Sequence, residues 1–421
     1  MDKLIVSGPN KLFGSVEISS SKNATLPILA ATILYPGKIT FNKLPKLSDI
    51  NFFVQILESL GAKSNKDGDD TSINAINLNN TKADYDLVRK MRASVLVLGP
   101  LLSRFGHAEV SLPGGCAIGA RPVDIHLKGL EKMGAQIDLK NGYIHASTER
   151  LQGAHIHLAF PSVGATENLM MAAAYAQGET ILENAAQEPE IEDLANFMIK
   201  MGFEVSGAGT STIKIQGKDY SDIHKKEISY RVIGDRIEAA TYIIAGLITN
   251  SSIIVKDFNP IHLKAVIDIL LEMGAKLEIG EDEVKVFPSG KLKGTKIETA
   301  PYPGFPTDVQ AQLMALMGIA EGNSIISEHI FENRFMHVPE LVRMAMDIEL
   351  DGHSAFIRGV DQLETAPVMC TDLRASAALV LAALVAKGET VINRIYHLDR
   401  GYQDLELKLQ KLGAQIKRIK S

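Results

Sequence analysis

A sequence unit of about 70 residues recurs six times along this chain and constrains its fold more than any other feature. In five copies, a segment with helical periodicity ends in Leu-Gly or Met-Gly and leads into a strand-like segment; these glycines are Gly61, Gly134, Gly202, Gly274 and Gly413. Glycine at a helix end is typical of a left-handed terminal turn. The remaining copy has Ala345 in the place of the glycine, and we expect a locally different turn there.

A second recurring element lies midway between these glycines. It is an alanine-rich, almost wholly apolar segment with helical spacing, as in residues 239–248 and 375–386, and a strand-like segment follows it. Helices that are apolar nearly all round are buried, whereas the charged helix of each unit, such as residues 124–133, is expected to be half exposed. Each unit therefore reads strand, helix, strand, helix, strand, strand.

Six such units divide naturally into two sets of three. A solenoid is the competing layout, but solenoid repeats usually span about 20–50 residues and expose their helices. The wholly apolar helix of each unit instead favours helices packed centrally with sheets outside them. The sequence therefore predicts an α/β protein with two similar domains, each of three units around buried helices, and a ligand site in the cleft between the domains.

Composition and charge limit the partners and the location of the protein. The 421 residues suffice for two domains, the formal net charge is −6, and no long basic block is present, which argues against general nucleic-acid binding. The most apolar stretch, residues 375–386, is shorter than the roughly 20 residues that span a bilayer, and no secretory signal is visible. We expect a cytoplasmic protein without membrane insertion, and the sequence indicates no oligomeric state.

Cysteine usage and cofactor motifs narrow the chemistry further. Two cysteines in the whole chain exclude a disulfide framework and a cysteine-based zinc site. The sequence has no phosphate-binding P-loop and no dinucleotide fingerprint after a strand, and its histidines lack metal-ligand spacing. It therefore predicts neither a cofactor nor a metal.

Cys116 lies in the most unusual segment of the chain, SLPGGCAIGARPVD at residues 111–124. The glycines and prolines of this segment predict a loop. A buried, inert cysteine is the ordinary alternative, but glycine neighbours offer no apolar packing, and the nearby Arg121 favours a reactive thiol that acts as acid or nucleophile. Cys370, beside a predicted strand, is expected to be structural.

Cationic residues recur where the apolar helices are expected to begin: Lys22, Arg92, Arg236 and Arg374. Backbone N–H groups at a helix start favour anions, and a neighbouring cation strengthens that preference. Shared descent of the repeats is the alternative explanation for this recurrence. Predicted loops add two further guanidinium groups, Arg334 and Arg400. Because guanidinium suits phosphate and carboxylate, these residues together indicate a small polyanionic substrate.

Asp308, in FPTDVQAQ, begins a predicted helix in the same position as Asp372 in CTDLRAS. An aspartate at a helix start is either an N-cap, which stabilises by about 0.5–2 kcal/mol, or a carboxylate with a catalytic role. The residues alone leave both readings of Asp308 open.

Several long strings in this sequence resemble the enolpyruvyl transferases, and the resemblance runs from end to end. The strings are SKNATLPILAA, MRASVLVLGPLL, LPGGCAIGARPVD, FPSVGATENLMMAA, EPEIEDLANF, FPTDVQAQ, FENRFMHVPEL, TDLRASAALVLA and DRGY. The loop around Cys116 is similar to that of the branch of the family that uses UDP-N-acetylglucosamine. The resemblance implies an inside-out α/β barrel of βαβαββ units, with residues 22–232 in one domain and residues 1–21 and 233–421 in the other.

The resemblance also implies an activity without a cofactor. This activity is transfer of the enolpyruvyl group from phosphoenolpyruvate to the 3′-hydroxyl of UDP-N-acetylglucosamine by addition and elimination, releasing phosphate, in the first committed step of peptidoglycan synthesis. Cys116 is then the general acid, which can form a covalent adduct and be alkylated by fosfomycin, and Asp308 is the general base. The resemblance implies that Lys22, Arg121 and Arg400 bind the phosphate of phosphoenolpyruvate. It implies that Arg334 and Arg374 bind the carboxylate.

The other contacts that the resemblance implies are to the nucleotide sugar and around the cleft. They are Asn23, Arg92, Arg121, Pro122, Val123, Asp124, Ile125, Phe160, Pro161, Ser162, Val163, Gly164, Ile330 and Asp372. Two alternatives stay open: an enzyme of the 5-enolpyruvylshikimate-3-phosphate synthase type, and a non-catalytic paralogue that keeps the nucleotide-sugar cleft. The Cys116 loop argues against the first, and the presence of Lys22, Cys116, Asp308 and Arg400 together argues against the second.

Overall fold

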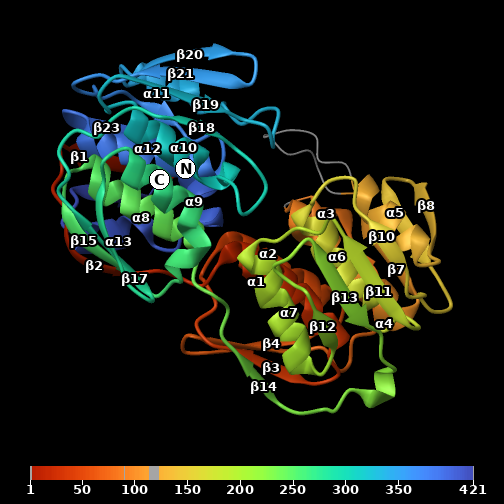
Figure 1. Ribbon diagram of the computed structural model, residues 1–421. Coiled ribbons are helices and arrows are strands. Elements are labelled where there is room, and N and C mark those ends of the chain that lie inside the picture. Colours follow the sequence, from red (N-terminus) through yellow and green to blue (C-terminus); the bar gives the residue numbers. More distant parts are fainter. Residues whose placement is uncertain (1, 90, 113–122, 421) are drawn as a thin grey trace. The chain divides into compact units, whose positions relative to one another are not determined.

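The computed structural model describes residues 2–89, 91–112 and 123–420, which form two compact units (Figure 1). The N-terminal unit comprises residues 20–112 and 123–233, and the C-terminal unit comprises residues 2–19 and 234–420. The chain passes between the units after Ser19 and again after Ile233. The expectations for Cys116, Arg121 and Pro122 fall outside the described residues.

Each unit contains three four-stranded sheets with one shared pattern, in which the first two strands pair in parallel and the other pairs are antiparallel. The sheets of the N-terminal unit are β14(Ile228–Tyr230)-β3(Lys38–Phe41)-β5(Asp70–Asn74)-β4(Lys63–Asp67), β6(Lys82–Ala83)-β7(His107–Ser111)-β9(Tyr143–Ser147)-β8(Gln136–Lys140) and β10(His155–His157)-β11(Glu179–Glu183)-β13(Thr212–Gln216)-β12(Glu204–Ser206). Those of the C-terminal unit are β22(Val368–Met369)-β23(Gly388–Asn393)-β1(Lys3–Gly8)-β24(Ile416–Ile419), β2(Phe13–Glu17)-β15(Ser252–Lys256)-β17(Glu283–Phe287)-β16(Lys276–Ile279) and β18(Lys296–Glu298)-β19(Asn323–Ser327)-β21(Ser354–Arg358)-β20(Asp347–Asp351). The six-fold repeat predicted from the sequence is thus confirmed as six copies of one sheet.

The helices fall into the two predicted kinds. The buried helices are α1 (Lys22–Ala31), α4 (Leu98–Phe105), α6 (Val163–Ala173), α8 (Arg236–Ile248), α10 (Thr307–Met317) and α12 (Leu373–Val385). The half-exposed helices are α2 (Ser48–Ser59), α5 (Asp124–Lys132), α7 (Pro189–Met201), α9 (Lys264–Glu272), α11 (Val338–Arg343) and α13 (Leu405–Lys411). Shorter turns complete the set: α3 (Tyr85–Val88), η1 (Thr32–Leu34), η2 (Arg92–Val97), η3 (Tyr220–Asp222), η4 (Pro260–Leu263) and η5 (Ile395–Arg400). All 13 residues of α8 are buried, as an all-round apolar helix requires.

The three buried helices of the N-terminal unit end at the same place. Tyr175, just past α6, donates its backbone N–H to Ser103 Oγ on α4 at 3.2 Å and its hydroxyl to Leu34 O after α1. Arg104 Nη1, also on α4, donates to Ile33 O at 2.7 Å. Because their ends meet, the starts of these helices lie together at the opposite end of the bundle. This arrangement gathers the residues that begin the helices.

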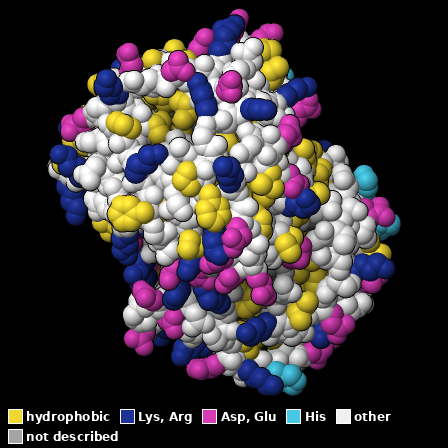
Figure 2. All heavy atoms as spheres, turned by 60° about the vertical axis from the view of Figure 1, so that its left-hand side comes forward, with side chains coloured by type: hydrophobic (Ala, Val, Ile, Leu, Met, Phe, Trp, Pro, Cys, Tyr) yellow, Lys and Arg dark blue, Asp and Glu magenta, His cyan; other side chains and the backbone are white. Residues whose placement is uncertain are grey.

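The described part of the chain contains no helix that is long and apolar enough to cross a membrane. Figure 2 shows positive and negative side chains interspersed over the visible surface, in keeping with a net charge of only −6.

The turn at Ala345 does not differ from its glycine counterparts, so the expectation of a locally different turn was wrong. Ala345 has φ +65°, in the same left-handed region as Gly274 at +98°. The two backbone hydrogen bonds of the turn are also the same: Ala345 N to Val342 O and Met346 N to Leu341 O correspond to Gly274 N to Leu271 O and Ala275 N to Leu270 O. Alanine therefore carries backbone strain that glycine would not.

Replacement of Ala345 by glycine should raise the free energy of unfolding by about 0.5–1 kcal/mol, because relief of the left-handed strain exceeds the extra entropy of the unfolded chain. The reverse change, Gly274→Ala, should lower it by about 1 kcal/mol, since open space surrounds Gly274 and only the backbone conformation resists the methyl group. Urea unfolding of both variants measures the two changes. A loss of stability in Ala345→Gly would contradict this account of the turn.

Candidate active site

Lys22 is the first residue of the buried helix α1 and is held there by a carboxylate. Its Nζ lies 3.1 Å from Asp49 Oδ2, and the Asp49 side chain, on α2, is only 1% exposed. The N-cap Ser21 accepts a hydrogen bond from Ala24 N at 3.3 Å. A cation at a helix start opposes the helix dipole, so Asp49 offsets that repulsion and fixes the ammonium at the end of the bundle.

Other expected residues lie at equivalent starts in the N-terminal unit. Asn23 follows Lys22, Arg92 opens η2 directly before α4, and Asp124 and Ile125 open α5. Ser162 is the N-cap of α6 and accepts from Ala165 N at 3.4 Å. Val163 and Gly164 form the first turn of α6, and Phe160 before them is 43% exposed. Pro161 completes this approach to the helix, and Val123 precedes α5.

Asp308 joins two guanidinium groups in the C-terminal unit. Its Oδ1 lies 2.8 Å from Arg334 Nη2 and its Oδ2 lies 3.0 Å from Arg374 Nη2. The arginine side chains are only 4% and 3% exposed, whereas Asp308 is 27% exposed. Burial alone would lower the pKa of Arg374, but Asp308 more than offsets this effect and the pKa is raised. The structure thus brings together three of the residues that the sequence singled out.

Asp308 and Asp372 are not in the same position, which corrects the expectation from the sequence. Asp372 is the N-cap of α12 and accepts from Arg374 N at 2.8 Å and Ala375 N at 3.0 Å. Helix α10 instead begins after its N-cap Pro306, so Asp308 is the second residue of the helix and not its N-cap. The N-cap reading of Asp308 was wrong, because its oxygens serve the two arginines.

Two further arginines of the C-terminal unit were expected at a helix start, Arg236, and in a loop, Arg400. Arg236 is the first residue of α8, and its guanidinium lies 5.5 Å from the centre of the Tyr302 ring. The N-cap Asp235 accepts from two backbone amides at the start of α8. Arg400 is the last residue of η5.

Glu328 is a buried carboxylate that the sequence reasoning missed. Its Oε2 accepts from Thr307 Oγ1 at 2.9 Å, and its Oε1 accepts from the amides of Ile330 and Phe331 at 2.8 and 3.2 Å. Glu328 therefore fastens the segment that carries Ile330 to the first residue of α10, beside Asp308. No local pattern reveals this role, because Thr307 lies 21 residues away along the chain.

Gln312 and Tyr402 were missed as well. Gln312 Nε2 donates to Asp308 O at 2.9 Å and to the Tyr402 hydroxyl at 3.1 Å, and that hydroxyl also meets Thr241 Oγ1 of α8 at 2.9 Å. The Arg374 guanidinium lies 5.6 Å from the centre of the Tyr402 ring. This network joins α8, α10 and α12 behind Asp308. The available signal in the sequence was the pair of glutamines, Gln310 and Gln312, in an otherwise mostly apolar helix.

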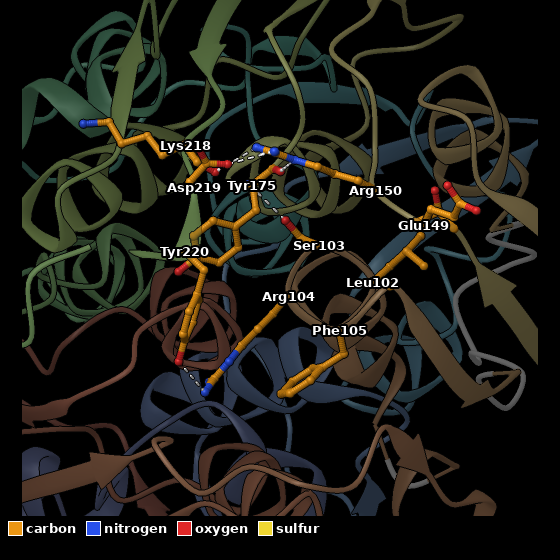
Figure 3. Close-up of a pocket in the computed structure, with 12 residues that line it drawn as sticks. Leu102, Ser103, Arg104, Phe105, Glu149, Arg150, Tyr175, Lys218, Asp219 and Tyr220 are labelled. Atoms are coloured by element: carbon orange, nitrogen blue, oxygen red, sulfur yellow. Dashed lines mark hydrogen bonds and ion pairs between the residues drawn. The ribbon is translucent and has the colours of Figure 1, made fainter. Parts of the chain in front are cut away.

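The cavity in Figure 3 lies at the other end of the N-terminal unit. It has a volume of about 350 Å³ and is lined by residues around the ends of α4 and α6, among them Arg104, Arg150 and Tyr220. Arg104 donates to the Tyr220 hydroxyl at 3.0 Å, and Arg150 pairs with Asp219 at 2.8 Å. None of the expected site residues lines it. Arg104 and Arg150 donate to backbone carbonyl groups just past the ends of buried helices, so the side chains that line the cavity have a structural role.

Among the described residues, no group of three or more His, Cys, Asp or Glu side chains is placed to hold a metal ion. Cys370, the described cysteine, is 1% exposed, and burial raises the pKa of its thiol to about 11. It is structural, as expected.

The geometry and the comparisons agree on the class of protein. The fold is that of the enolpyruvyl transferases: the enolpyruvyl transferase NikO from Streptomyces tendae superposes with a TM-score of 0.90 over 100% of this chain and 99% of that chain, at 26% identity. EPSP synthase from Acinetobacter baumannii shares the fold, with a TM-score of 0.77 at 17% identity over the full length of both chains. A family model described as EPSP synthase (3-phosphoshikimate 1-carboxyvinyltransferase) matches residues 6–409.

Curated relatives give the particular family. UDP-N-acetylglucosamine 1-carboxyvinyltransferase of Geotalea uraniireducens is 54% identical over 420 residues, covering 100% of both chains. The enzymes of the same name from Idiomarina loihiensis and Coxiella burnetii are 54% and 52% identical over 100% of this chain and 100% and 97% of theirs. The chain belongs to the UDP-N-acetylglucosamine 1-carboxyvinyltransferase family.

Replacement of Asp308 by alanine should lower the free energy of unfolding by about 3 kcal/mol, because it leaves two buried guanidinium groups without their carboxylate. The matched control is Glu278→Ala, which removes the partner of Lys285 in an exposed pair and should cost less than about 1 kcal/mol. Denaturant unfolding of both variants measures the difference. Equal losses would show that the Asp308 pairs contribute no more than surface pairs.

The Cys116→Ser variant should resist thiol reagents at pH 7.5 while folded. Thiolate is the reactive form, and a pKa of about 11 leaves almost no thiolate on Cys370 at this pH. In guanidinium chloride the same variant should label on one thiol. Rapid labelling of the folded variant would contradict the burial of Cys370.

Proposed function

We propose that this protein transfers the enolpyruvyl group of phosphoenolpyruvate to the 3′-hydroxyl of UDP-N-acetylglucosamine, releasing phosphate, in the first committed step of peptidoglycan synthesis. The observation that carries this proposal is identity of 54% over the full length of an enzyme named for that acceptor and that transferred group. The substrates are cytoplasmic metabolites, so we place the reaction in the cytoplasm. No cofactor is required.

The charges of phosphoenolpyruvate suit the cations of the site. Its phosphate and carboxylate need several donors, and we assign the phosphate to Lys22, Arg121 and Arg400. Arg374 suits the carboxylate, because Nη2 is engaged by Asp308 while the buried Nη1 has no hydrogen-bond partner among the described residues. An unpartnered buried guanidinium nitrogen is unusual without a ligand. Arg334 supports it from the other side of Asp308.

The reaction divides into addition and elimination. We assign Cys116 as the acid that protonates C3 of phosphoenolpyruvate, which makes C2 electrophilic, and the sugar oxygen then forms its bond to C2 as Asp308 accepts the hydroxyl proton. In the second step a proton leaves C3, the double bond reforms, and the C2–O bond to phosphate breaks. The Asp308 oxygens accept N–H groups from Arg334 and Arg374 in the structure, which fixes the position of the carboxylate that we assign as the base.

The acceptor suits the helix starts of the N-terminal unit. A nucleotide diphosphate is an anion for which the first turn of α6, Val163 and Gly164, offers backbone N–H groups. We assign further contacts with the nucleotide sugar to Asn23, Arg92, Asp124 and the residues beside them at the neighbouring starts, and to Ile330 and Asp372 in the C-terminal unit.

The two alternatives are weaker. The sequence identity to EPSP synthase is 17%, so that similarity supports only a shared fold. The sequence identity to a UDP-N-acetylglucosamine 1-carboxyvinyltransferase is 54%. The joint presence of Lys22, Cys116, Asp308 and Arg400 argues against a non-catalytic paralogue.

Phosphate release tests the proposed activity. Mixing the protein with phosphoenolpyruvate and UDP-N-acetylglucosamine should release phosphate continuously, because elimination expels it in every turnover. Shikimate 3-phosphate in place of the nucleotide sugar is the control and should give none. Release with shikimate 3-phosphate alone would favour the first alternative, and no release despite binding of the nucleotide sugar would favour the second.

Replacement of Cys116 by serine should lower kcat by at least about a hundredfold, since a positioned general acid contributes roughly 10²–10⁴. The same variant should no longer be alkylated by fosfomycin, which intact-mass measurement detects as one adduct on the unaltered protein. Cys370→Ser is the control and should keep both turnover and alkylation. Unchanged alkylation of Cys116→Ser would reject the assignment of Cys116.

A further inference from the structure

Tyr402 is a buried tyrosine two residues after Arg400, the last residue of η5, and is only 2% exposed. Gly401, between them, lies against Leu373, the first residue of α12, and an added Cβ would be 2.5 Å from Leu373 Cδ2. The end of η5, which carries Arg400, therefore lies directly against the start of α12, which carries Arg374.

The direction of the hydrogen bonds around the Tyr402 hydroxyl follows from the chemistry of its partners. Burial raises the pKa of Tyr402, and Arg374 acts in the opposite direction, so the hydroxyl keeps its proton at physiological pH. Gln312 Nε2 lies 3.1 Å from the hydroxyl oxygen and, as an amide nitrogen, only donates. The hydroxyl proton is therefore donated to Thr241 Oγ1 at 2.9 Å, and Thr241 in turn donates its own proton to Ile237 O at 2.9 Å.

Gln312 links this hydroxyl to the helix that carries Asp308. Its Nε2 donates to Asp308 O at 2.9 Å as well as to Tyr402. Because a backbone carbonyl only accepts, the amide nitrogen and not the amide oxygen must face it, which fixes the orientation of the amide. Gln312 is fully buried, and its Oε1 has no hydrogen-bond partner among the described residues. The fold therefore retains this glutamine at the cost of an unsatisfied acceptor.

Arg374 completes the set from α12. Its guanidinium lies 5.6 Å from the centre of the Tyr402 ring, within the range of a cation–π contact, and its Nη2 lies 3.0 Å from Asp308 Oδ2. Burial is the largest influence on the pKa of Arg374 and lowers it, but Asp308, Tyr402 and Asp235 act in the opposite direction and the pKa is raised. Tyr402 thus contacts Arg374 with its ring and reaches Asp308 through Gln312.

We propose that Tyr402 is a positioning residue for phosphoenolpyruvate, because its hydroxyl fixes the end of η5, and with it Arg400, relative to Asp308 and Arg374. The proposal rests on the proposed function, in which Arg400 binds the phosphate and Arg374 the carboxylate of phosphoenolpyruvate. Both groups are attached to C2, so the distance between the two arginines must match one short molecule. In this role Tyr402 acts through the arginines and touches no substrate.

Replacement of Tyr402 by phenylalanine keeps the ring and removes only the hydroxyl. In the phosphate-release assay, kcat/KM for phosphoenolpyruvate should fall at least about tenfold, mainly through KM, because a small displacement of a binding group is enough. KM for UDP-N-acetylglucosamine should stay within about threefold, because most of its contacts are assigned to the N-terminal unit. An equal rise in both KM values would indicate a general structural role and overturn the proposal.

The matched control is Tyr242→Phe. Tyr242 belongs to the same unit and is 1% exposed, but its hydroxyl has no hydrogen-bond partner among the described residues. Both KM values should therefore stay within about threefold in this variant. A loss for phosphoenolpyruvate as large as that of Tyr402→Phe would show that any buried tyrosine hydroxyl of this unit has the same effect, which would contradict the assignment.

Two substitutions of Thr241 test the hydrogen bond itself. Thr241→Val removes the acceptor of the Tyr402 proton with little change of shape and should lower kcat/KM for phosphoenolpyruvate, whereas Thr241→Ser keeps the acceptor and should stay within about threefold. In a Tyr402→Phe background, Thr241→Val should have no further effect, because the hydroxyl that it served is gone. Fully additive losses would contradict a shared hydrogen bond.

The anchoring of η5 is measured without any substrate. In hydrogen–deuterium exchange, peptides that cover residues 394–404 should exchange faster in Tyr402→Phe than in the unaltered protein, and Tyr242→Phe should leave them unchanged. Unchanged exchange in Tyr402→Phe would overturn the positioning role even if turnover falls. Failure of the unaltered protein to release phosphate would instead overturn the proposed function and the role toward phosphoenolpyruvate, while exchange still decides whether Tyr402 fixes this segment.

Discussion

The packing of helices that have no polar face is the constraint on which the rest of this structure depends. A helix such as α8, buried along its entire length, presents its unpaired backbone groups only at its two ends. In the N-terminal unit one set of ends is closed by Arg104, Ser103 and Tyr175, which bond to one another's helices. The starts present first-turn backbone N–H groups, which favour an anion.

Cations at helix starts require compensation, and the structure supplies it with buried carboxylates. Lys22 is paired with Asp49, and Arg334 and Arg374 share Asp308. These pairs hold the cations in place in the absence of substrate, so little reorganisation is needed when a polyanion arrives. In the proposed mechanism Asp308 has two functions, because the carboxylate that positions the arginines also accepts the proton of the acceptor hydroxyl.

Periodicity predicted the fold well because it reports a property shared by many residues. The apolar helices, the six sheets and the cations at helix starts all follow from a pattern that any one substitution leaves intact. Ala345 shows the limit of the method: its turn keeps the left-handed conformation because the surrounding repeat imposes it, although the residue itself disfavours it.

The details of the site depend on contacts between residues distant in the sequence, and these were not predictable. The local string left open whether Asp308 is an N-cap or a functional carboxylate, because the two arginines that it contacts lie 26 and 66 residues away. The segment around Cys116 lies outside the described residues, so its assignment still rests on sequence.

Deuterium incorporation tests the central claim, transfer by addition and elimination, most directly. The reaction is run in D₂O with phosphoenolpyruvate and UDP-N-acetylglucosamine, and the product is analysed by mass spectrometry and proton NMR after the first few turnovers. Protonation of C3 by a group in exchange with solvent predicts an enolpyruvyl ether that carries deuterium at C3. An enolpyruvyl product whose C3 position contains no deuterium would contradict a mechanism that passes through a protonated C3.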